Sequence, residues 1–459
     1  MVFSSLIFIF FFLPLFFLSY FILKKRKTRN YALLLFSLIF YAWGEPIYIF
    51  LIILSTIVNY YLAILINNKK DKKLYLIIDI IFNIGLLFLF KYNNFFIEIL
   101  NNILNTNIHF VRISLPIGIS FFTFQILTYV IDVYLKKVKV QKNILYLGTY
   151  ILAFPQLIAG PIVRYETVED ELENRRETIT DFAYGVRRFI KGLGKKVLLA
   201  NTFAYIATAI FSDTPLVYGL IGSWVGIISY ALQIYFDFSG YSDMAIGIGR
   251  MLGFNYLENF NFPYIAKSVT EFWRRWHISL STFFRDYVYI PMGGNRVSIL
   301  KWIRNVLVVW GLTGLWHGAS YNYIIWGLYF AVLLILEKFF IQKILNKLPS
   351  IVGHIYLIII VLFSWTIFRS ENLVELLDIL KSMLGFNGIG NINLYFYVGI
   401  ISIENIVIFI LGILFSTPIL NHVNIKNNYI KDALLIIIFI LSILSILTSS
   451  YNPFIYFRF

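Results

Sequence analysis

Two histidines are the residues in this chain best suited to chemistry. His317 lies between Trp316 and Gly318, in a glycine-rich and nearly uncharged stretch, and His277 lies in a basic and aromatic stretch. An imidazole titrates near neutral pH, so it can take a proton from a hydroxyl group and later return it. Ionisable side chains are costly in an apolar region and are often functional there. We therefore predict that His317 and His277 are catalytic, while a structural role for His277 stays open.

Arginine and aromatic side chains alternate around His277, from residue 271 to residue 296. One interpretation is an amphipathic segment at the membrane interface, where Trp, Tyr and Arg are common. The other is a binding site for an anionic donor, such as a phosphate-bearing thioester carrier, because guanidinium groups bind phosphate in a fixed geometry. For this second interpretation, the predicted substrate-binding residues are Arg274, Arg275, Arg285 and Trp316.

The composition predicts an all-α polytopic membrane protein. Of the 459 residues, 59% are hydrophobic and only 14% are charged, far from the quarter typical of soluble domains. The net charge of +15 comes from Lys and Arg in short loops between apolar runs, which is typical of cytoplasmic loops and also favours contact with anionic lipid. The chain has no cysteine and no zinc or nucleotide-binding motif, so we predict no metal site.

The apolar runs predict about eleven to twelve membrane segments, some of them re-entrant or broken. The basic residues that follow the first run predict a cytoplasmic loop there, and hence an extracytoplasmic N-terminus. The Gly44-Glu45-Pro46 sequence predicts a break between two helices. We also predict an outer loop over residues 91–112, a re-entrant or kinked segment over 143–164, an amphipathic helix over 182–196, and a hairpin over 302–338 with His317 near its turn.

Three charges lie beside an apolar and glycine-rich run. They are Asp237, Asp243 and Arg250. Asp243 and Arg250 are seven positions apart and so share one helix face. The spacing predicts an internal ion pair among these three residues, with a structural role rather than a catalytic one.

Several motifs together resemble a known family. They are AGPIVRY at residues 159–165, YFDFSGYSDMAIG at 235–247, FWRRWHISLSTFFRDYVYIPMGGNR at 272–296, GLWHGASYNYIIWG at 314–327, and the closing FIYFRF. With these motifs the chain resembles the membrane-bound O-acyltransferase (MBOAT) family, and within it the alginate O-acetyltransferase-like subgroup. The resemblance spans essentially the whole chain.

The resemblance implies a single transmembrane domain over residues 1–459, with helices around a central funnel. It implies an enzyme of the plasma membrane that binds no cofactor and takes an acyl group from a cytoplasmic thioester, commonly acetyl-CoA. An extracytoplasmic partner protein would complete O-acetylation of a polysaccharide. His317 corresponds to the family's catalytic histidine, in the WHG motif, and His277 to the second signature histidine, in the RRWH motif.

Three alternatives stay open beside this function. The first is D-alanyl transfer to teichoic acid, by an exporter of the same family. The YIPMGGNR sequence at residues 289–296 favours the acetyltransferase subgroup over it. The others are a transporter without chemistry, which broken helices and intramembrane charges also fit, and a structural scaffold of an export machine.

Overall fold

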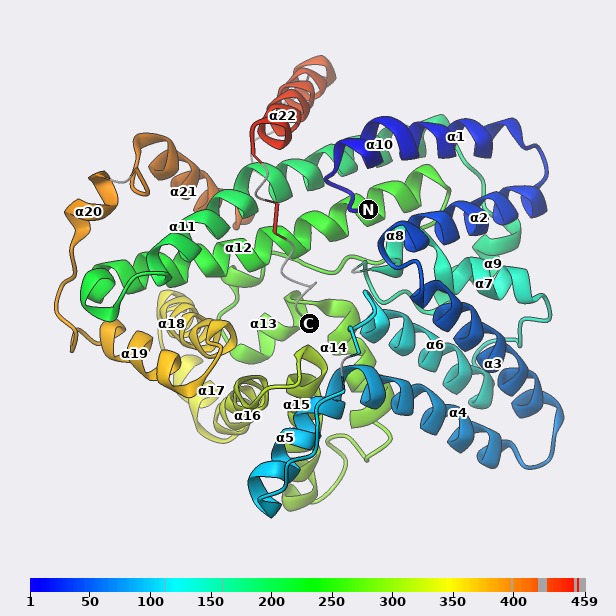
Figure 1. Ribbon diagram of the computed structural model, residues 1–459, viewed down its shortest axis with the longest axis horizontal. Coiled ribbons are helices and arrows are strands. Elements are labelled where there is room, and N and C mark those ends of the chain that lie inside the picture. Colours follow the sequence, from blue (N-terminus) through cyan, green and yellow to red (C-terminus); the bar gives the residue numbers. More distant parts are fainter. Residues whose placement is uncertain (112, 159, 398, 420–426, 450–451, 454–459) are drawn as a thin grey trace. The chain divides into compact units, whose positions relative to one another are not determined.

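Most of the residues that the computed structural model describes are helical, and these residues contain no strand (Figure 1). The described ranges are 1–111, 113–158, 160–397, 399–419, 427–449 and 452–453. The closing FIYFRF sequence lies outside them. The predicted all-α membrane protein is therefore confirmed.

Six helical stretches are long and apolar enough to cross a membrane, by length and composition. Three shorter apolar helices accompany them, at Phe8–Ile22, Ile119–Tyr134 (α6) and Ile403–Phe415 (α21). Together they confirm a multi-pass membrane protein, while the total of eleven to twelve segments stays a prediction. The six stretches are Tyr48–Asn68 (α3), Lys72–Leu104, Pro215–Met251 (α12), Tyr321–Leu345, Ser350–Arg369 (α18) and Asn428–Thr448 (α22).

The contacts between residues divide the chain into two units, and a single domain over the whole chain stays a prediction. The first unit comprises residues 1–190 and 241–258, and the second comprises residues 191–240 and 259–459. The main helices of the first unit are α1 (Leu13–Ile22), α2 (Arg26–Gly44), α3, α4 (Lys72–Leu87), α5 (Asn93–Leu104), α6, α7 (Ile144–Leu152), α8 (Phe154–Leu157), α9 (Tyr165–Asn174) and most of α10 (Ile179–Gly194).

Predicted breaks in the first unit lie where the sequence places them. Helix α2 ends at Gly44 and α3 begins at Tyr48, so the Gly-Glu-Pro sequence separates two helices. A second break falls at Ala153, which has extended ψ between α7 and α8 and precedes a proline at the start of α8. Helix α10 confirms the predicted amphipathic helix, with bounds that begin slightly earlier than expected.

The predicted loop over residues 91–112 is wrong for its first half, which is helical as α5. The asparagines that suggested a loop lie on this helix. Asn94 bonds the backbone of Val111 in both directions, and Asn101 does the same at Ile108. These side chains thus satisfy backbone N–H and carbonyl groups of the extended segment that follows the helix. They fasten that segment to α5 and do not interrupt the helix.

The three intramembrane charges do not pair with one another. Asp243 lies 2.6 Å from Arg188, Asp237 lies 2.8 Å from Lys196, and Arg250 lies 3.4 Å from Asp181. Each partner comes from α10 or the turn that follows it. The structural role predicted for these charges fits this arrangement, but the predicted partners were wrong because the pairing is between helices.

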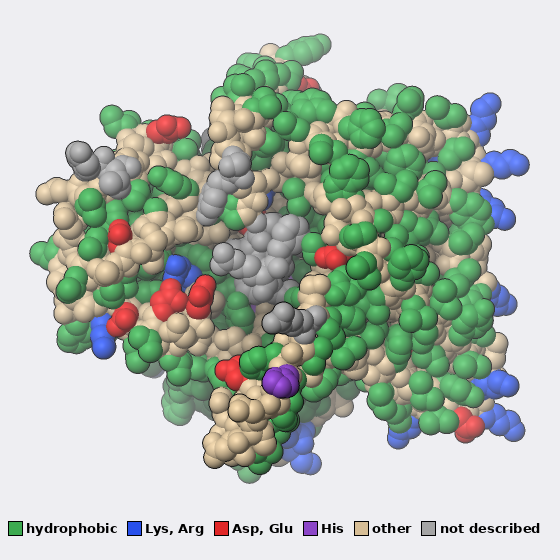
Figure 2. Space-filling model, viewed as in Figure 1, with side chains coloured by type: hydrophobic (Ala, Val, Ile, Leu, Met, Phe, Trp, Pro, Cys, Tyr) green, Lys and Arg blue, Asp and Glu red, His purple; other side chains and the backbone are tan. Residues whose placement is uncertain are grey.

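Basic side chains gather at one end of the first unit's helices. Lys24 and Lys25 lie between α1 and α2, and Lys70 lies between α3 and α4. Figure 2 shows Lys and Arg along the edge of this unit where these helices end, beside faces covered by hydrophobic side chains. At the same end, the carboxylate of Glu177 accepts hydrogen bonds from Arg26 and Tyr20. Burial raises the pKa of Glu177, but these hydrogen bonds outweigh it and lower the pKa to about 2.

Helices of the second unit carry both histidines. They are the first part of α12, α11 (Asn201–Phe211), α13 (Val269–Arg275), α14 (Ile278–Phe284), α15 (Ile299–His317), α16 (Tyr321–Leu336), α17 (Gln342–Leu345), α18, α19 (Leu373–Met383), α20 (Ile392–Tyr397), α21 and α22. A π-helical turn, Glu337–Ile341, joins α16 to α17. Helices α15 and α16 form the predicted hairpin.

Candidate functional site

His277 occupies the corner between two short helices. Helix α13 ends at Arg275 and α14 begins at Ile278, so His277 lies in the turn and is fully buried. Its φ of 43° is left-handed, a conformation that is uncommon for residues other than glycine and costs free energy. The surrounding contacts hold the ring in this strained corner.

Glu337 anchors the helix that leads to this corner. Its carboxylate accepts hydrogen bonds from the backbone N–H groups of Val269 and Thr270 and from the Thr270 hydroxyl. The Tyr356 hydroxyl donates a further bond to it. Because Glu337 is buried, these donors replace the water that a carboxylate would otherwise need. They also satisfy N–H groups at the start of α13, which no helical carbonyl can reach.

Asn259 fixes the tautomer of His277. The Asn259 Oδ1 atom accepts hydrogen bonds from the Ser279 backbone N–H at 3.1 Å and from the Ser279 hydroxyl at 2.9 Å. A backbone N–H can only donate, so the amide oxygen must face this way. His277 Nδ1 lies 3.3 Å from the same oxygen. Nδ1 therefore carries the hydrogen, and Nε2 is the ring atom that can accept a proton or a hydrogen bond.

Burial keeps the His277 ring neutral. The fully buried ring lies against Phe238, with ring centroids 4.6 Å apart, and burial lowers the pKa of His277 to about 3. An apolar environment disfavours the charged imidazolium, which explains the direction of this change. At neutral pH, His277 is thus an uncharged ring with a hydrogen on Nδ1.

His317 is the last residue of α15, at the hairpin turn. The ring is buried inside an aromatic box whose centroids lie 4.9 Å away at Trp316, 4.9 Å at Trp326 and 5.1 Å at Phe368. Gly318 ends the helix, and its N–H donates to the Leu315 carbonyl. His317 therefore points into the protein, and a lipid-facing histidine is excluded.

Glycines set the position of His317 by bringing α15 and α16 into backbone contact. A Cβ at Gly314 would lie 2.2 Å from the Tyr323 carbonyl oxygen, and one at Gly327 would lie 2.2 Å from that of Trp310. Only glycine fits at such distances, and small residues commonly allow close packing of membrane helices. The hairpin is thereby locked in one register, with His317 at its end.

Trp316 joins the two histidines. Its ring centroid lies 5.7 Å from that of His277 and 4.9 Å from that of His317. The two imidazoles are therefore separated by no more than the sum of these distances, although 39 residues intervene in the sequence. Residues of two separate segments thus form one buried centre that consists of two imidazoles and an indole.

Two of the three arginines that were predicted to bind substrate pair with nearby carboxylates. Arg275 pairs with Glu271 at 2.8 Å, and Arg285 pairs with its neighbour Asp286 at 2.6 Å. Arg274 is exposed. Their predicted role in substrate binding stays a prediction, and local carboxylates already compensate two of the three charges.

Sequence reasoning missed two buried polar residues that support the centre, Asn259 and Glu337. Asn259 precedes His277 by 18 positions and Glu337 follows it by 60. Asn259 lies in an extended stretch without a recognisable motif, and Glu337 looks like the charged end of an apolar helix. The contacts that matter are long-range, so neither residue carries a local signal.

Comparison with known proteins gives a consistent assignment. The family model of MBOAT, the membrane-bound O-acyltransferase family, matches residues 108–374, which contain both histidines. The chain is 40% identical over 398 residues to the probable alginate O-acetylase AlgI of Pseudomonas aeruginosa, covering 84% of this chain and 75% of that protein.

Two further relatives carry other names. The chain is 36% identical over 426 residues to a peptidoglycan O-acetyltransferase of Helicobacter pylori, covering 85% of this chain and 81% of that protein. It is 33% identical over 268 residues to a teichoic acid D-alanyltransferase of Bacillus subtilis, covering 55% of this chain and 67% of that one. These matches confirm the predicted acyltransferase: the chain belongs to the membrane-bound O-acyltransferase family.

Proposed function

We propose that this protein transfers an acetyl group from a cytoplasmic thioester, acetyl-CoA, for O-acetylation of a cell-surface or secreted polysaccharide. The observation that carries the proposal is the buried centre in which Trp316 contacts both His277 and His317. The names of the alginate and peptidoglycan relatives support acetyl transfer to a glycan. The teichoic acid relative matches a smaller share of the chain, so D-alanyl transfer is the weaker alternative.

The proposed reaction forms one ester and releases one thiol. His317 takes the proton from the acceptor hydroxyl while the hydroxyl oxygen attacks the thioester carbonyl carbon. The tetrahedral intermediate then collapses, the C–S bond breaks, and the proton on His317 passes to the thiolate. No metal or redox cofactor is needed for this sequence of steps.

His277 has a different role from His317 in this proposal. A ring that is neutral well below pH 7 retains a proton poorly, so it is a weak general base. Its Nε2 atom can still accept a hydrogen bond from the acceptor hydroxyl or from a transient thiol. We therefore assign the proton transfer to His317 and the orientation of the reacting group to His277.

A hydrogen-bond donor must stabilise the oxyanion of the intermediate. The Gly318 N–H in the glycine-rich turn already bonds to the Leu315 carbonyl, so it does not serve this purpose in the described conformation. Arg274 is the arginine of the RRWH segment whose charge no neighbouring carboxylate offsets among the described residues. We assign binding of the donor's phosphate groups to Arg274, whose side chain is exposed.

The proposal includes a topology and a partner. The N-terminus is extracytoplasmic and the lysine-rich helix ends of the first unit face the cytoplasm, as the distribution of basic residues favours. An extracytoplasmic protein accepts or relays the acetyl group to the polymer.

The test is O-acetylation of the surface polymer in a strain that lacks this protein. Complementation with the wild type should restore ester-linked acetate, and His317→Ala should restore none although the protein is inserted at normal levels. His109→Ala is the matched control, since His109 is exposed and distant in sequence from both motifs. Full rescue by His317→Ala would refute the catalytic assignment of His317. Release of D-alanine in place of acetate from the polymer would refute acetyl as the transferred group.

A further inference from the structure

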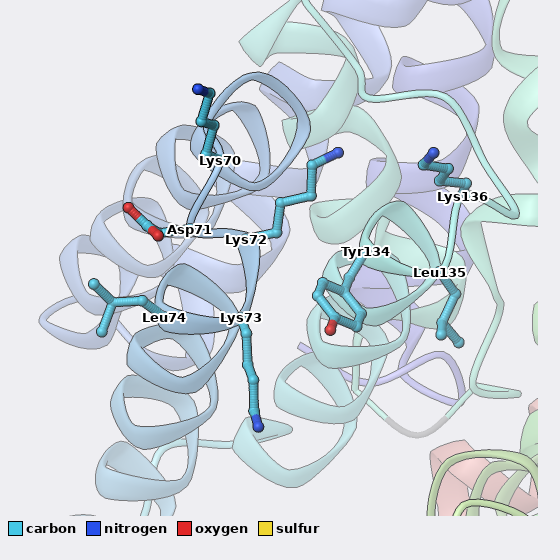
Figure 3. A pocket seen from close by; sticks show the side chains of 8 residues that line it. All are labelled: Lys70, Asp71, Lys72, Lys73, Leu74, Tyr134, Leu135 and Lys136. Carbon is cyan, nitrogen blue, oxygen red and sulfur yellow. The ribbon is translucent and has the colours of Figure 1, made fainter.

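A basic pocket lies in the first unit, whereas both histidines belong to the second, and the function proposed above does not use this pocket. Its volume is about 680 Å³, and it lies where α3 is followed by α4 and where α6 ends. It is lined by Lys70, Asp71, Lys72, Lys73, Leu74, Tyr134, Leu135 and Lys136 (Figure 3). Four lysines and one aspartate give this small volume an excess of positive charge.

The lysines come from two separate elements and meet at one space. Figure 3 shows Lys72, at the start of α4, and Lys136, after the end of α6, with their ammonium groups extended toward each other. No hydrogen bond or ion pair within the described part of the chain engages the side chains of Lys70, Lys72, Lys73 or Lys136. Like charges that converge without a carboxylate between them repel, so an anion in the pocket would relieve that repulsion.

The backbone at Lys136 adds an independent observation. Lys136 has a φ of 60° and follows the last turn of α6, where the Lys137 N–H bonds to the Asp132 carbonyl. This arrangement is a Schellman motif, and glycine is the usual residue at the left-handed position. A lysine there is strained, and this conformation directs its side chain into the pocket.

Apart from Asp71, the rest of the lining is apolar or aromatic. Leu74 and Leu135 are about half exposed, and Tyr134 lines the pocket with them. Helix α3 and the stretch Lys72–Leu104 are both apolar enough to cross a membrane, so the pocket lies at the ends of spans, where lipid headgroups are found. Cations beside exposed apolar side chains match the phosphate and the adjoining glycerol and acyl carbons of one phospholipid.

We propose that this pocket binds the headgroup of an anionic phospholipid, with the lysines on the phosphate and the leucines on the first acyl carbons. Basic pockets between membrane helices commonly bind such headgroups. The proposal does not depend on the acyltransferase reaction. A free phosphate ester has the same phosphate group but no acyl carbons that could contact the leucines. The lipid should therefore bind more tightly than the free ester, and the difference in affinity distinguishes the two ligands.

The test measures lipid binding by the purified full-length protein in a neutral detergent. The probes are short-chain phosphatidylglycerol, short-chain phosphatidylcholine and glycerol 3-phosphate. The pocket variant combines Lys70→Gln, Lys72→Gln, Lys73→Gln and Lys136→Gln. The matched control, Lys24→Gln, Lys25→Gln, Lys343→Gln and Lys347→Gln, removes the same charge from exposed lysines outside the pocket.

Phosphatidylglycerol should bind the wild type in preference to phosphatidylcholine, and the pocket variant should raise its dissociation constant by at least about tenfold while the control variant leaves it unchanged. Equal weakening in both variants would show general charge attraction and overturn the proposal. Equal affinity for phosphatidylcholine would also overturn it, as would glycerol 3-phosphate binding as tightly as the lipid.

A second variant separates binding from folding. Lys136→Gly removes the charge and relieves the left-handed backbone, so the protein should melt at a higher temperature while its affinity for phosphatidylglycerol falls. Loss of binding could then not be attributed to unfolding. Unchanged affinity in this variant would overturn the assignment of Lys136 to the lipid phosphate.

Discussion

Substitutions at Asn259 test whether the centre works with a neutral His277. In Asn259→Ala, the buried Ser279 N–H loses its acceptor and His277 Nδ1 loses the Asn259 oxygen beside it. The unsatisfied Ser279 N–H alone costs about 1–3 kcal/mol of the free energy of unfolding. That is a substantial part of the about 5–15 kcal/mol typical of a folded domain. We expect Asn259→Ala to fold poorly and to lose activity.

Asn259→Asp is the informative variant, because a carboxylate can accept the same three hydrogen bonds. It also places a negative charge about as far from the ring as the amide oxygen, which lies 3.3 Å from Nδ1. An opposite charge at such a distance raises the pKa of a histidine by roughly one to three pH units, so the His277 pKa would move from about 3 to roughly 4–6. The variant should be active at pH 7 and lose activity as Nε2 becomes protonated at lower pH.

The assay is thiol release from acetyl-CoA by the purified enzyme, with turnover measured from pH 4 to pH 8. Ser279→Ala is the control, because its backbone N–H still bonds to Asn259 and only the adaptable hydroxyl is lost. Because protonation of His317 lowers the turnover of both enzymes, the measured quantity is the ratio of variant to wild-type turnover, which should fall as the pH decreases. A folded Asn259→Asp enzyme whose ratio stays constant down to pH 4 would refute the reasoning. It would show that the protonation of His277 does not matter to the reaction.

Two further predictions concern stability, measured by thermal unfolding of the full-length protein in detergent. Gly327→Ala should destabilise the protein by about 1–3 kcal/mol, because its Cβ would lie 2.2 Å from the Trp310 carbonyl oxygen. The control Gly311→Ala, whose Cβ would have no atom within 4 Å, should stabilise the protein by up to about 1 kcal/mol. Equal effects of the two substitutions would contradict the close packing of α15 and α16. The pKa of Glu177 falls from 4.5 to about 2 on folding, so its pairing with Arg26 stabilises the protein above pH 4.5 and is lost as the pH falls toward 2. Glu177→Gln should remove this dependence of stability on pH. If the variant still lost the same stability at low pH, other groups would be its cause.

Residue type and motif were sufficient to predict the hairpin that carries His317 and to single out two histidines that lie in one buried centre, while their catalytic role stays a prediction. The glycine-rich stretch predicted a hairpin with His317 near its turn, and the structure places His317 at that turn. Hydropathy was sufficient for the membrane class, because span length and apolar composition are local properties. Proline and glycine correctly marked the break after Gly44 for the same reason.

Contacts between distant segments could not be predicted. Spacing along one helix suggested that Asp243 pairs with Arg250, whereas Arg188 of another helix is its partner. Asn259 was missed for the same reason, because its contact with His277 joins two separate segments. In the sequence, an isolated asparagine is usually interpreted as a turn residue. The helix α5 was missed because its asparagines look like loop formers until their bonds to the following segment are known.

The anchoring of α13 by Glu337 has a consequence for how the protein is made. His277 emerges from the ribosome about 60 residues before the carboxylate that satisfies the start of its helix. During synthesis, the N–H groups of Val269 and Thr270 therefore lack this acceptor until the α15–α16 hairpin and the residues after it have been made. A chain that stalls before Glu337 lacks the carboxylate that anchors the start of α13, and with it one of the contacts that hold the corner at His277.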